Sequence, residues 1–248
     1  MGVKVKWVSG VVMLILWGLP AWAFDPFGET GYFLTPTTEV VGLKNFSFGV
    51  RFLDWPTSGD DLIGGGLVAG LGQNWEVGWG IASWEDEDIN SFSFKYRFYH
   101  DRRTKLTLAG GGAWTIRGGG GRLESDQDPL AYFVASIPYI FGTIHLGAMW
   151  LDDENDSKTV APFGSVDYDL YPDVKIFYEV TGTSRISRRL AHHIALQWKP
   201  SEKYPLFVQA GAVISEFVRA RGTDTVFTAG LSILYSEKLI EKFEQIEE

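Results

Sequence analysis

Cysteine is absent from the sequence, so no disulfide can hold the fold together. A secreted domain of this size without disulfides depends on apolar burial or on complete strand pairing. Long apolar runs are absent too: beyond residue 23 there is no stretch of about 18 consecutive apolar residues, which argues against membrane-spanning helices. Positive charge is also scarce, with 22 Lys and Arg against 31 Asp and Glu. This balance argues against nucleic acid as a partner.

The first 23 residues have the pattern of a secretory signal peptide. Lys4 and Lys6 form a basic start, residues 8–17 are mostly apolar, and residues 21–23, AWA, form a small-x-small cleavage site. Cleavage near Ala23 leaves 225 of the 248 residues, and the loss of two lysines takes the formal net charge from −9 to −11. We therefore expect the mature chain to be exported.

Glycine and aromatic residues are abundant, with 29 Gly, 17 Phe, 10 Trp and 10 Tyr. Together they suit a barrel, where glycine relieves crowding at bends and aromatic residues lie at membrane interfaces. The clearest segment is residues 92–98, FSFKYRF, in which aromatic residues alternate with Ser93, Lys95 and Arg97. One face of such a strand is aromatic and the other carries two cations. A soluble sandwich would bury the aromatic face on a second sheet, whereas a transmembrane barrel would turn it toward lipid.

The same alternation recurs along the chain and predicts twelve strands. They cover residues 46–53, 62–71, 75–84, 92–98, 106–116, 131–139, 143–151, 161–170, 174–180, 191–198, 206–214 and 227–235. In the eighth strand, Phe163 and Val166 have opposite parity, so we expect a bulge near Gly164. Connections after odd-numbered strands are long or charged, and those after even-numbered strands are mostly tight, which is typical of an outer-membrane barrel.

The predicted fold class is therefore all-β: a transmembrane antiparallel up-and-down β-barrel of about 12 strands in the outer membrane. An extended lead-in over residues 24–43 precedes the barrel, which covers residues 44–235. The barrel is narrow, so the Gly-, Thr- and Pro-rich lead-in is expected to insert into its lumen. Residues 236–248 are predicted to form a short amphipathic helical tail on the periplasmic side. Its apolar face consists of Leu239, Ile240, Phe243 and Ile246.

Inward-facing parity predicts a set of charged residues that line the lumen. These are Arg51, Glu76, Lys95, Arg97, Asp167, Lys175 and Glu179. A channel for anionic sugars would show a mostly basic lining. The mixture of signs instead indicates salt bridges that close the interior.

Two kinds of charge cluster fall in the predicted outer loops. A basic group could contact lipopolysaccharide phosphates or acidic sugars, although an unpartnered surface cluster would have the same composition. It consists of Arg185, Arg188, Arg189, Arg219 and Arg221. Acidic runs at residues 85–88 and 152–156 could bind a divalent cation, but their spacing matches no known cation loop, which favours solvated loops. No cofactor motif and no metal site are predicted.

An enzymatic function would require a nucleophile near a base. Outer-membrane lipases place His and Ser on the lipid-facing surface near the outer rim, and His192 has that parity. Ser184 or Ser187 lies in the loop just before it. This arrangement permits a lipid-modifying enzyme but is unspecific, so no catalytic residue is assigned.

Two segments resemble the YjbH-like outer-membrane proteins, which are linked to exopolysaccharide production. They are GETGYFLTPTTEVV at residues 28–41 and GSVDYDLYPDVKIFYEVTG at residues 164–182. The long form of that family is much longer than this chain, so the resemblance concerns its barrel portion. It implies a non-enzymatic envelope protein that assists export or assembly of polysaccharide. Its expected partners are outer-membrane lipids, lipopolysaccharide and polysaccharide.

Barrel physics alone permits a different function, a passive channel for small solutes or oligosaccharides. A lipid-modifying enzyme that uses His192 is the third class. The sequence contains no strongly signed pore and no nucleophile constellation that would choose between these classes.

Overall fold

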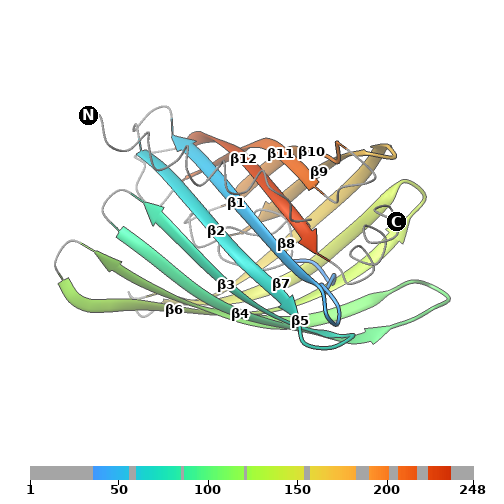
Figure 1. Ribbon diagram of the computed structural model, residues 1–248, viewed down its shortest axis with the longest axis horizontal. Helices are drawn as coiled ribbons and strands as arrows, with labels where there is room; N and C mark the ends of the chain where they lie inside the picture. The colour runs from blue at the N-terminus through green and yellow to red at the C-terminus, as the bar shows by residue number, and fades with distance from the viewer. Residues whose placement is uncertain are drawn as a thin grey trace, which may run out of the picture.

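The computed structural model shows one closed barrel of twelve antiparallel strands (Figure 1). It describes residues 36–55, 60–84, 87–119, 122–153, 157–182, 190–200, 206–216 and 223–235. The strands are β1 Phe46–Trp55, β2 Asp60–Gly70, β3 Trp75–Trp84, β4 Glu87–His100, β5 Thr107–Gly119, β6 Arg122–Tyr139, β7 Gly142–Asp153, β8 Ser157–Tyr171, β9 Val174–Thr181, β10 Ala191–Trp198, β11 Leu206–Glu216 and β12 Thr223–Tyr235. The predicted twelve-stranded antiparallel barrel is confirmed.

Each strand pairs with its neighbours in sequence, and β1 closes the barrel by pairing with β12. The closing ladder runs from Phe46 opposite Tyr235 to Asp54 opposite Phe227. The rings of Phe46 and Tyr235 stack there, with centroids 4.3 Å apart. Closure leaves no unpaired strand edge, which is the condition for a β-structure to lie in lipid.

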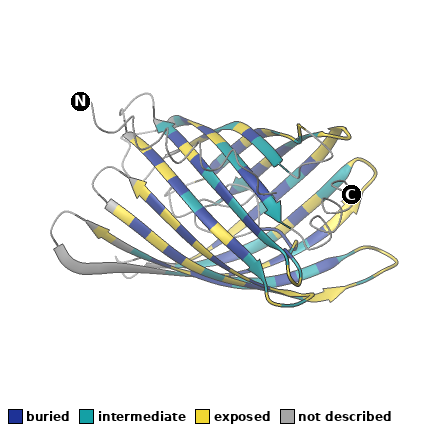
Figure 2. Ribbon diagram, viewed as in Figure 1, coloured by how far each residue is buried: buried dark blue, intermediate teal, exposed yellow. Residues whose placement is uncertain are grey.

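Burial alternates along the strands (Figure 2). The exposed outer positions carry large apolar residues, whereas the buried inner positions carry both polar and apolar ones. On β3, Trp75 and Trp79 are 47% and 45% exposed, whereas Glu76 between them is 2% exposed. A water-soluble sandwich would show the reverse pattern, because its aromatic faces would be buried against each other. The exterior therefore has the character of a lipid-facing surface.

The short turns gather at one end of the barrel, toward the right of Figure 1. They join β2 to β3, β4 to β5, β6 to β7 and β8 to β9. The start of β1 and the end of β12 lie at this same end, because Phe46 pairs with both Ala69 and Tyr235. The end of β10 and the start of β11 lie at this end too, because Trp198 pairs with both Val174 and Val208. The connections that follow odd-numbered strands start from the other end.

Several strands at that other end are longer than predicted. The segment predicted as a loop over residues 85–91 is mostly strand, because β3 ends at Trp84 and β4 begins at Glu87. In the same way β6 begins at Arg122, well before the predicted residue 131. Backbone pairing continues past the apolar belt into charged sequence, where the loss of alternation hides it from a hydrophobicity pattern.

The bulge predicted near Gly164 is wrong. The register between β7 and β8 runs without a shift from Gly142 opposite Tyr168 to Asp153 opposite Ser157. Phe163 points inward and is 5% exposed. Its aromatic character suggested a lipid-facing position, but it packs in an apolar cluster inside the barrel. The register shift of β8 lies instead against β9, between Asp169 and Tyr171.

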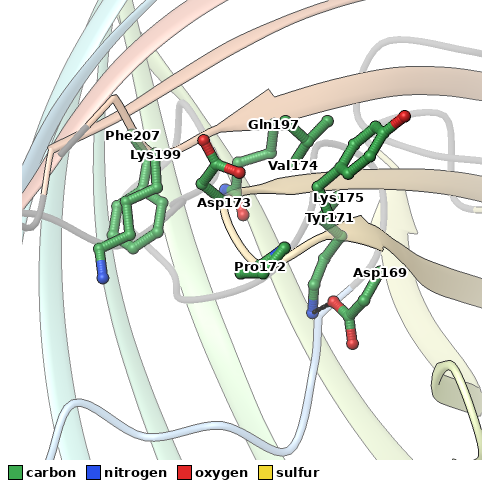
Figure 3. Close-up of a pocket in the computed structure, with 9 residues that line it drawn as sticks. All are labelled: Asp169, Tyr171, Pro172, Asp173, Val174, Lys175, Gln197, Lys199 and Phe207. Carbon is green, nitrogen blue, oxygen red and sulfur yellow. Dashed lines mark ion pairs between the residues drawn. The ribbon is translucent and has the colours of Figure 1, made fainter. Parts of the chain in front are cut away.

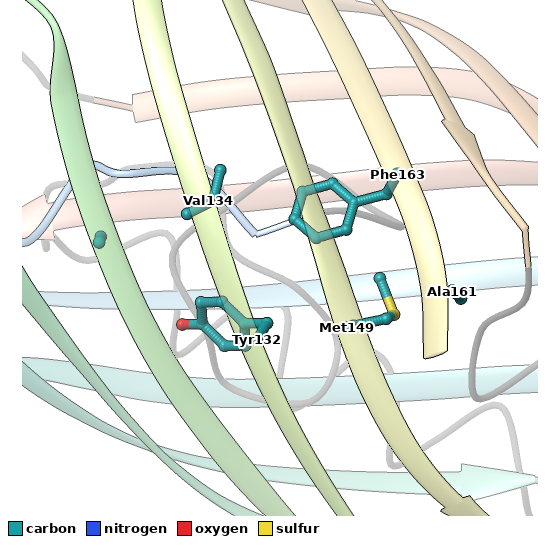
Figure 4. Packing of buried hydrophobic residues seen from close by; sticks show 6 residues of the cluster. Tyr132, Val134, Met149, Ala161 and Phe163 are labelled. Atoms are coloured by element: carbon teal, nitrogen blue, oxygen red, sulfur yellow. The ribbon is translucent and has the colours of Figure 1, made fainter. Parts of the chain in front are cut away.

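That inner cluster joins β5, β6, β7 and β8 (Figure 4). Tyr132 and Val134 come from β6, Met149 from β7, and Ala161 and Phe163 from β8. Leu130 and Leu151 pack against it. The barrel interior is therefore packed as a core on this side, as in other narrow barrels.

The predicted helical tail over residues 236–248 lies outside the described residues, as do the signal peptide and residues 24–35 of the lead-in. Within the described ranges, no helix is both long enough and apolar enough to span a membrane.

Candidate functional site

The end of the lead-in lies inside the short-turn half of the barrel. Thr37, Thr38 and Val41 are 2%, 4% and 7% exposed. Val41 packs on Val68 of β2 and on Leu234 of β12. These residues, the described end of the lead-in, are thus buried against the inner face of the barrel wall.

An ion pair on two neighbouring strands holds this segment. Glu76 of β3 is directly opposite Lys95 of β4, and Lys95 Nζ lies 3.2 Å from Glu76 Oε1. The backbone N–H of Val41 donates to Glu76 Oε2 at 2.9 Å, and Lys95 Nζ donates to the carbonyl of Glu39 at 3.1 Å. Buried charges are tolerated only when they are paired and hydrogen-bonded, and here the lead-in backbone completes both requirements.

A second polar chain crosses β6, β7, β8 and β9. The Asp167 carboxylate lies 3.0 Å from Lys175 Nζ and accepts a hydrogen bond from the Thr143 N–H at 3.2 Å. Its Oδ2 is 3.5 Å from His145 Nε2, and His145 Nδ1 is 2.5 Å from the Ser136 hydroxyl. Four strands are thereby cross-linked through side chains as well as through their backbones.

The order Ser136, His145, Asp167 resembles that of a serine hydrolase triad, but the environment does not suit catalysis. Each of these residues is 5% exposed or less, so a substrate has no access to the hydroxyl. Ser136 lies in a strand paired on both sides, where the backbone amides serve the ladder and none is free to stabilise an oxyanion. Asp167 is also shared with Lys175. This chain of polar side chains is therefore a structural network.

A third network joins β9, β10 and β12. His193 Nδ1 is 2.5 Å from Glu179 Oε2, and His193 Nε2 is 3.2 Å from the Thr228 hydroxyl. His193 and Glu179 are register partners on β10 and β9. Alternation along β9 and β10 places both side chains on the inner face. The contact with Thr228 depends on the closed barrel, in which β12 lies next to β11.

The other predicted lumen residues divide between the wall and the rim. Arg51 is inside and 5% exposed. Lys175 is partly exposed near the short-turn opening. Arg97 differs from the prediction: its guanidinium lies at the rim and donates to the Gln73 carbonyl at 2.8 Å and to Asn74 Oδ1 at 2.9 Å. Its place at the end of the strand, beside the register shift before Tyr99, brings it within reach of the β2–β3 turn.

The predicted basic cluster of the outer loops lies outside the residues that the structure describes. Residues 183–189 and 217–222, which contain all five loop arginines and both Ser184 and Ser187, lie outside the described residues. His192 is on the outer face as predicted, and its Nδ1 is 2.5 Å from the Tyr178 hydroxyl. Among the described residues, no group of three or more His, Asp or Glu side chains is arranged to hold a metal ion.

The short-turn opening contains a small pocket between β8 and β11 (Figure 3). Lys175, Gln197, Lys199, Asp169 and Phe207 are among the residues that line it. Its volume is about 80 Å³, enough for a few water molecules rather than a sugar ring.

No protein-family model matches the sequence, and no curated protein matches it. Among solved structures, the barrel is similar to the NanC porin with a TM-score of 0.58 and 11% identity, over 75% of this chain and 98% of that chain. It is also similar to the KdgM porin with a TM-score of 0.56 and 11% identity, over 77% and 99%. The outer membrane phospholipase A from Escherichia coli aligns over 77% and 92% with 10% identity, but its TM-score of 0.49 supports no functional comparison.

These likenesses concern the fold alone, which is a closed twelve-stranded antiparallel barrel. The resemblance to YjbH-like proteins and the role in exopolysaccharide production stay predictions, because no comparison bears on them.

Proposed function

We propose that this protein is an outer-membrane channel for small solutes or oligosaccharides. The observation that carries the proposal is the closed barrel itself, with charged and polar side chains buried inside beside apolar ones and large apolar side chains exposed outside, in a fold shared with two porins. A KdgM porin structure in complex with disordered oligogalacturonate is also similar, with a TM-score of 0.53 and 10% identity over 77% of this chain and 99% of that chain. It supports saccharides as one class of solute.

The charges inside favour weak selectivity for the sign of a solute. Glu76 is balanced by Lys95, and Asp167 by Lys175. A strongly selective pore would carry rings of like charge, whereas here each described pair cancels locally. Neutral sugars are therefore expected to pass as readily as weakly acidic ones of the same size.

The proposal is tested with the purified full-length protein in planar bilayers and in liposomes. Heat-modifiable migration on a gel first establishes that the barrel is folded. Discrete single-channel currents, together with liposome swelling in small sugars that declines as the sugars lengthen, are expected. A folded protein that produces neither current nor swelling, even when the contacts of the lead-in with Glu76 and Lys95 are removed, would contradict the channel function.

Assistance to polysaccharide export or assembly is the alternative that the family resemblance supports. A deletion strain separates the two functions when surface-bound polysaccharide and small-solute uptake are scored together. Reduced uptake with unchanged polysaccharide supports the channel. Changed polysaccharide with normal uptake, and no conductance from the purified protein, would support the assembly function instead.

A further inference from the structure

The contact between the lead-in and the barrel wall has the form of a strand pairing made by side chains. The Glu39 carbonyl and the Val41 N–H flank one residue, and in an extended chain these two groups point to the same side. Lys95 supplies the donor that meets the first, and Glu76 supplies the acceptor that meets the second. We call this arrangement the Glu76–Lys95 clamp.

The clamp binds backbone groups of the lead-in, and the side chains of the lead-in make contacts elsewhere on the barrel wall. Val41 is seated on Val68 and Leu234, and the Asn45 side chain donates to the Val41 carbonyl at 2.9 Å. Glu39 interacts electrostatically with Lys175 on the far wall. The described lead-in is therefore fastened to several strands at the short-turn end.

The fit between the lead-in and β2 is close enough to require glycine at both contacting positions. A Cβ added to Gly70 would lie 1.5 Å from the Gly42 carbonyl oxygen, which is no permissible contact. Gly42 has a φ of 79°, in the left-handed region that glycine adopts without strain. The chain turns sharply here, from the segment inside the lumen into the start of β1.

We propose that residues 36–42 of the lead-in form an internal plug of the channel and that the Glu76–Lys95 clamp is the latch that holds it. This inference rests on the proposed channel function and adds a closed state to it. In that state the segment over residues 36–42 occupies the short-turn end of the lumen. Passage of solute requires the two hydrogen bonds to the clamp to break and the segment to leave its seat on Val68.

One test removes the latch without leaving a buried charge unpaired. In the double variant Glu76→Gln/Lys95→Met both charges are lost, so neither partner is stranded. Two charge-assisted hydrogen bonds to the plug are weakened or lost, so the open fraction in planar bilayers is expected to rise by roughly tenfold or more. The matched control is Arg97→Gln, which removes a cation from the same strand that contacts the β2–β3 turn. This control is expected to gate as the wild type does.

A second test fixes the plug in place. Because the chain has no cysteine, the variant Val41→Cys/Val68→Cys can form one disulfide, at a position where the native residues are packed together. The oxidised protein is expected to stay closed, and a reducing agent should restore the currents. Either single-cysteine variant should respond to neither treatment. Formation of the bond is followed by thiol titration of the denatured protein.

The outcomes separate this inference from the function on which it rests. If the wild type conducts, but its gating is unchanged by the latch variant and by the disulfide, the plug is overturned and the channel survives. If the wild type, the latch variant and the reduced cysteine variant all fold and none conducts, the channel function itself is overturned. A disulfide-locked protein that conducts like the reduced form would by itself exclude the plug.

Discussion

The two halves of the barrel lumen are built on different principles. In the short-turn half the inner wall carries Glu76, Lys95, His145, Asp167 and Lys175, held in ion pairs and hydrogen bonds. In the other half the buried inner wall is mostly apolar, although Ser91, Thr115 and Thr181 are also buried there and His193 lies opposite Val213. The described apolar members of this wall include Leu53, Leu62, Ala82, Ile89, Met149, Ala161, Ala191, Val213 and Val226.

This difference shows what each half can do. The apolar half is stabilised by packing, which is non-directional and tolerates small shifts. The charged half depends on specific partners, and one of those partners is the lead-in backbone. A segment that has to bind and leave is better held by a few directional contacts than by a continuous apolar seat. The position of the plug in the charged half follows from this.

The largest effect is expected when one member of the Glu76–Lys95 pair is removed. Lys95→Met leaves the Glu76 carboxylate buried without its cation, at a cost of about 3–5 kcal/mol in the free energy of unfolding. Urea denaturation of the barrel in lipid vesicles measures it. The double variant Glu76→Gln/Lys95→Met should recover most of the loss. If the double variant is as unstable as Lys95→Met, the loss does not come from the unpaired Glu76 carboxylate. Packing of the Lys95 side chain would then dominate in this half too.

The second prediction checks which face of the barrel wall meets lipid and which faces the lumen. Phe94 is exposed on the outer face of β4, and Ser93 beside it has inward parity. Phe94→Arg should cost about 2–4 kcal/mol if it lies near the bilayer midplane, and Ser93→Arg should cost less. The same vesicle assay compares them. Equal costs would contradict the assignment of lipid-facing and lumen-facing sides.

The third prediction exchanges the character of two inward positions on β12. Val226 lies in the apolar half, whereas Thr228 is hydrogen-bonded to His193. Val226→Thr buries a hydroxyl and should cost about 1–3 kcal/mol, and Thr228→Val loses one hydrogen bond and should cost about 1 kcal/mol. If Val226→Thr left the free energy of unfolding unchanged, the apolar half would contain water or polar partners for the hydroxyl, and the contrast between the two halves would disappear.

The smallest effect is expected in the β4–β5 turn, outside both halves. The Asp101 carboxylate accepts hydrogen bonds from the Thr104 hydroxyl at 2.5 Å, the Arg103 N–H at 3.0 Å and the Thr104 N–H at 3.2 Å. With the Thr104 hydroxyl as the largest cause, these bonds hold the pKa of Asp101 below its ordinary value of 3.8. A lowered carboxyl pKa contributes stability above the ordinary pKa, and this stability is lost as the pH falls through the lowered value.

Asp101→Ala should therefore lower the thermal midpoint slightly at neutral pH. The difference from the wild type should shrink as the pH falls below the ordinary value of 3.8 and on through the lowered pKa of Asp101, because the wild-type carboxyl also becomes protonated there. Heat-modifiable gel migration across a temperature series measures both. A difference that persists unchanged at low pH would show that the turn depends on something other than the charge of Asp101.

The sequence by itself determined the architecture and the direction of most side chains. Period-two alternation is a local property, so twelve strands, their outward aromatic faces and the inward parity of Glu76, Lys95 and His193 could be predicted from neighbouring residues alone. The same local signal failed at positions where the sequence does not alternate between polar and apolar residues. It missed the extension of β6 to Arg122, and it misjudged Phe163, whose ring is inside the barrel.

Only the tertiary structure decided which inward residues meet. Register and closure bring Asp167 to His145 and Lys175, and bring Thr228 of β12 to His193 of β10. They also place the lead-in against the Glu76–Lys95 clamp, 35 and 56 residues away along the chain. Parity gives each residue a side of the wall but neither a height nor a partner. Those follow from the stagger between strands, which hydrogen bonding around the closed barrel fixes as a whole.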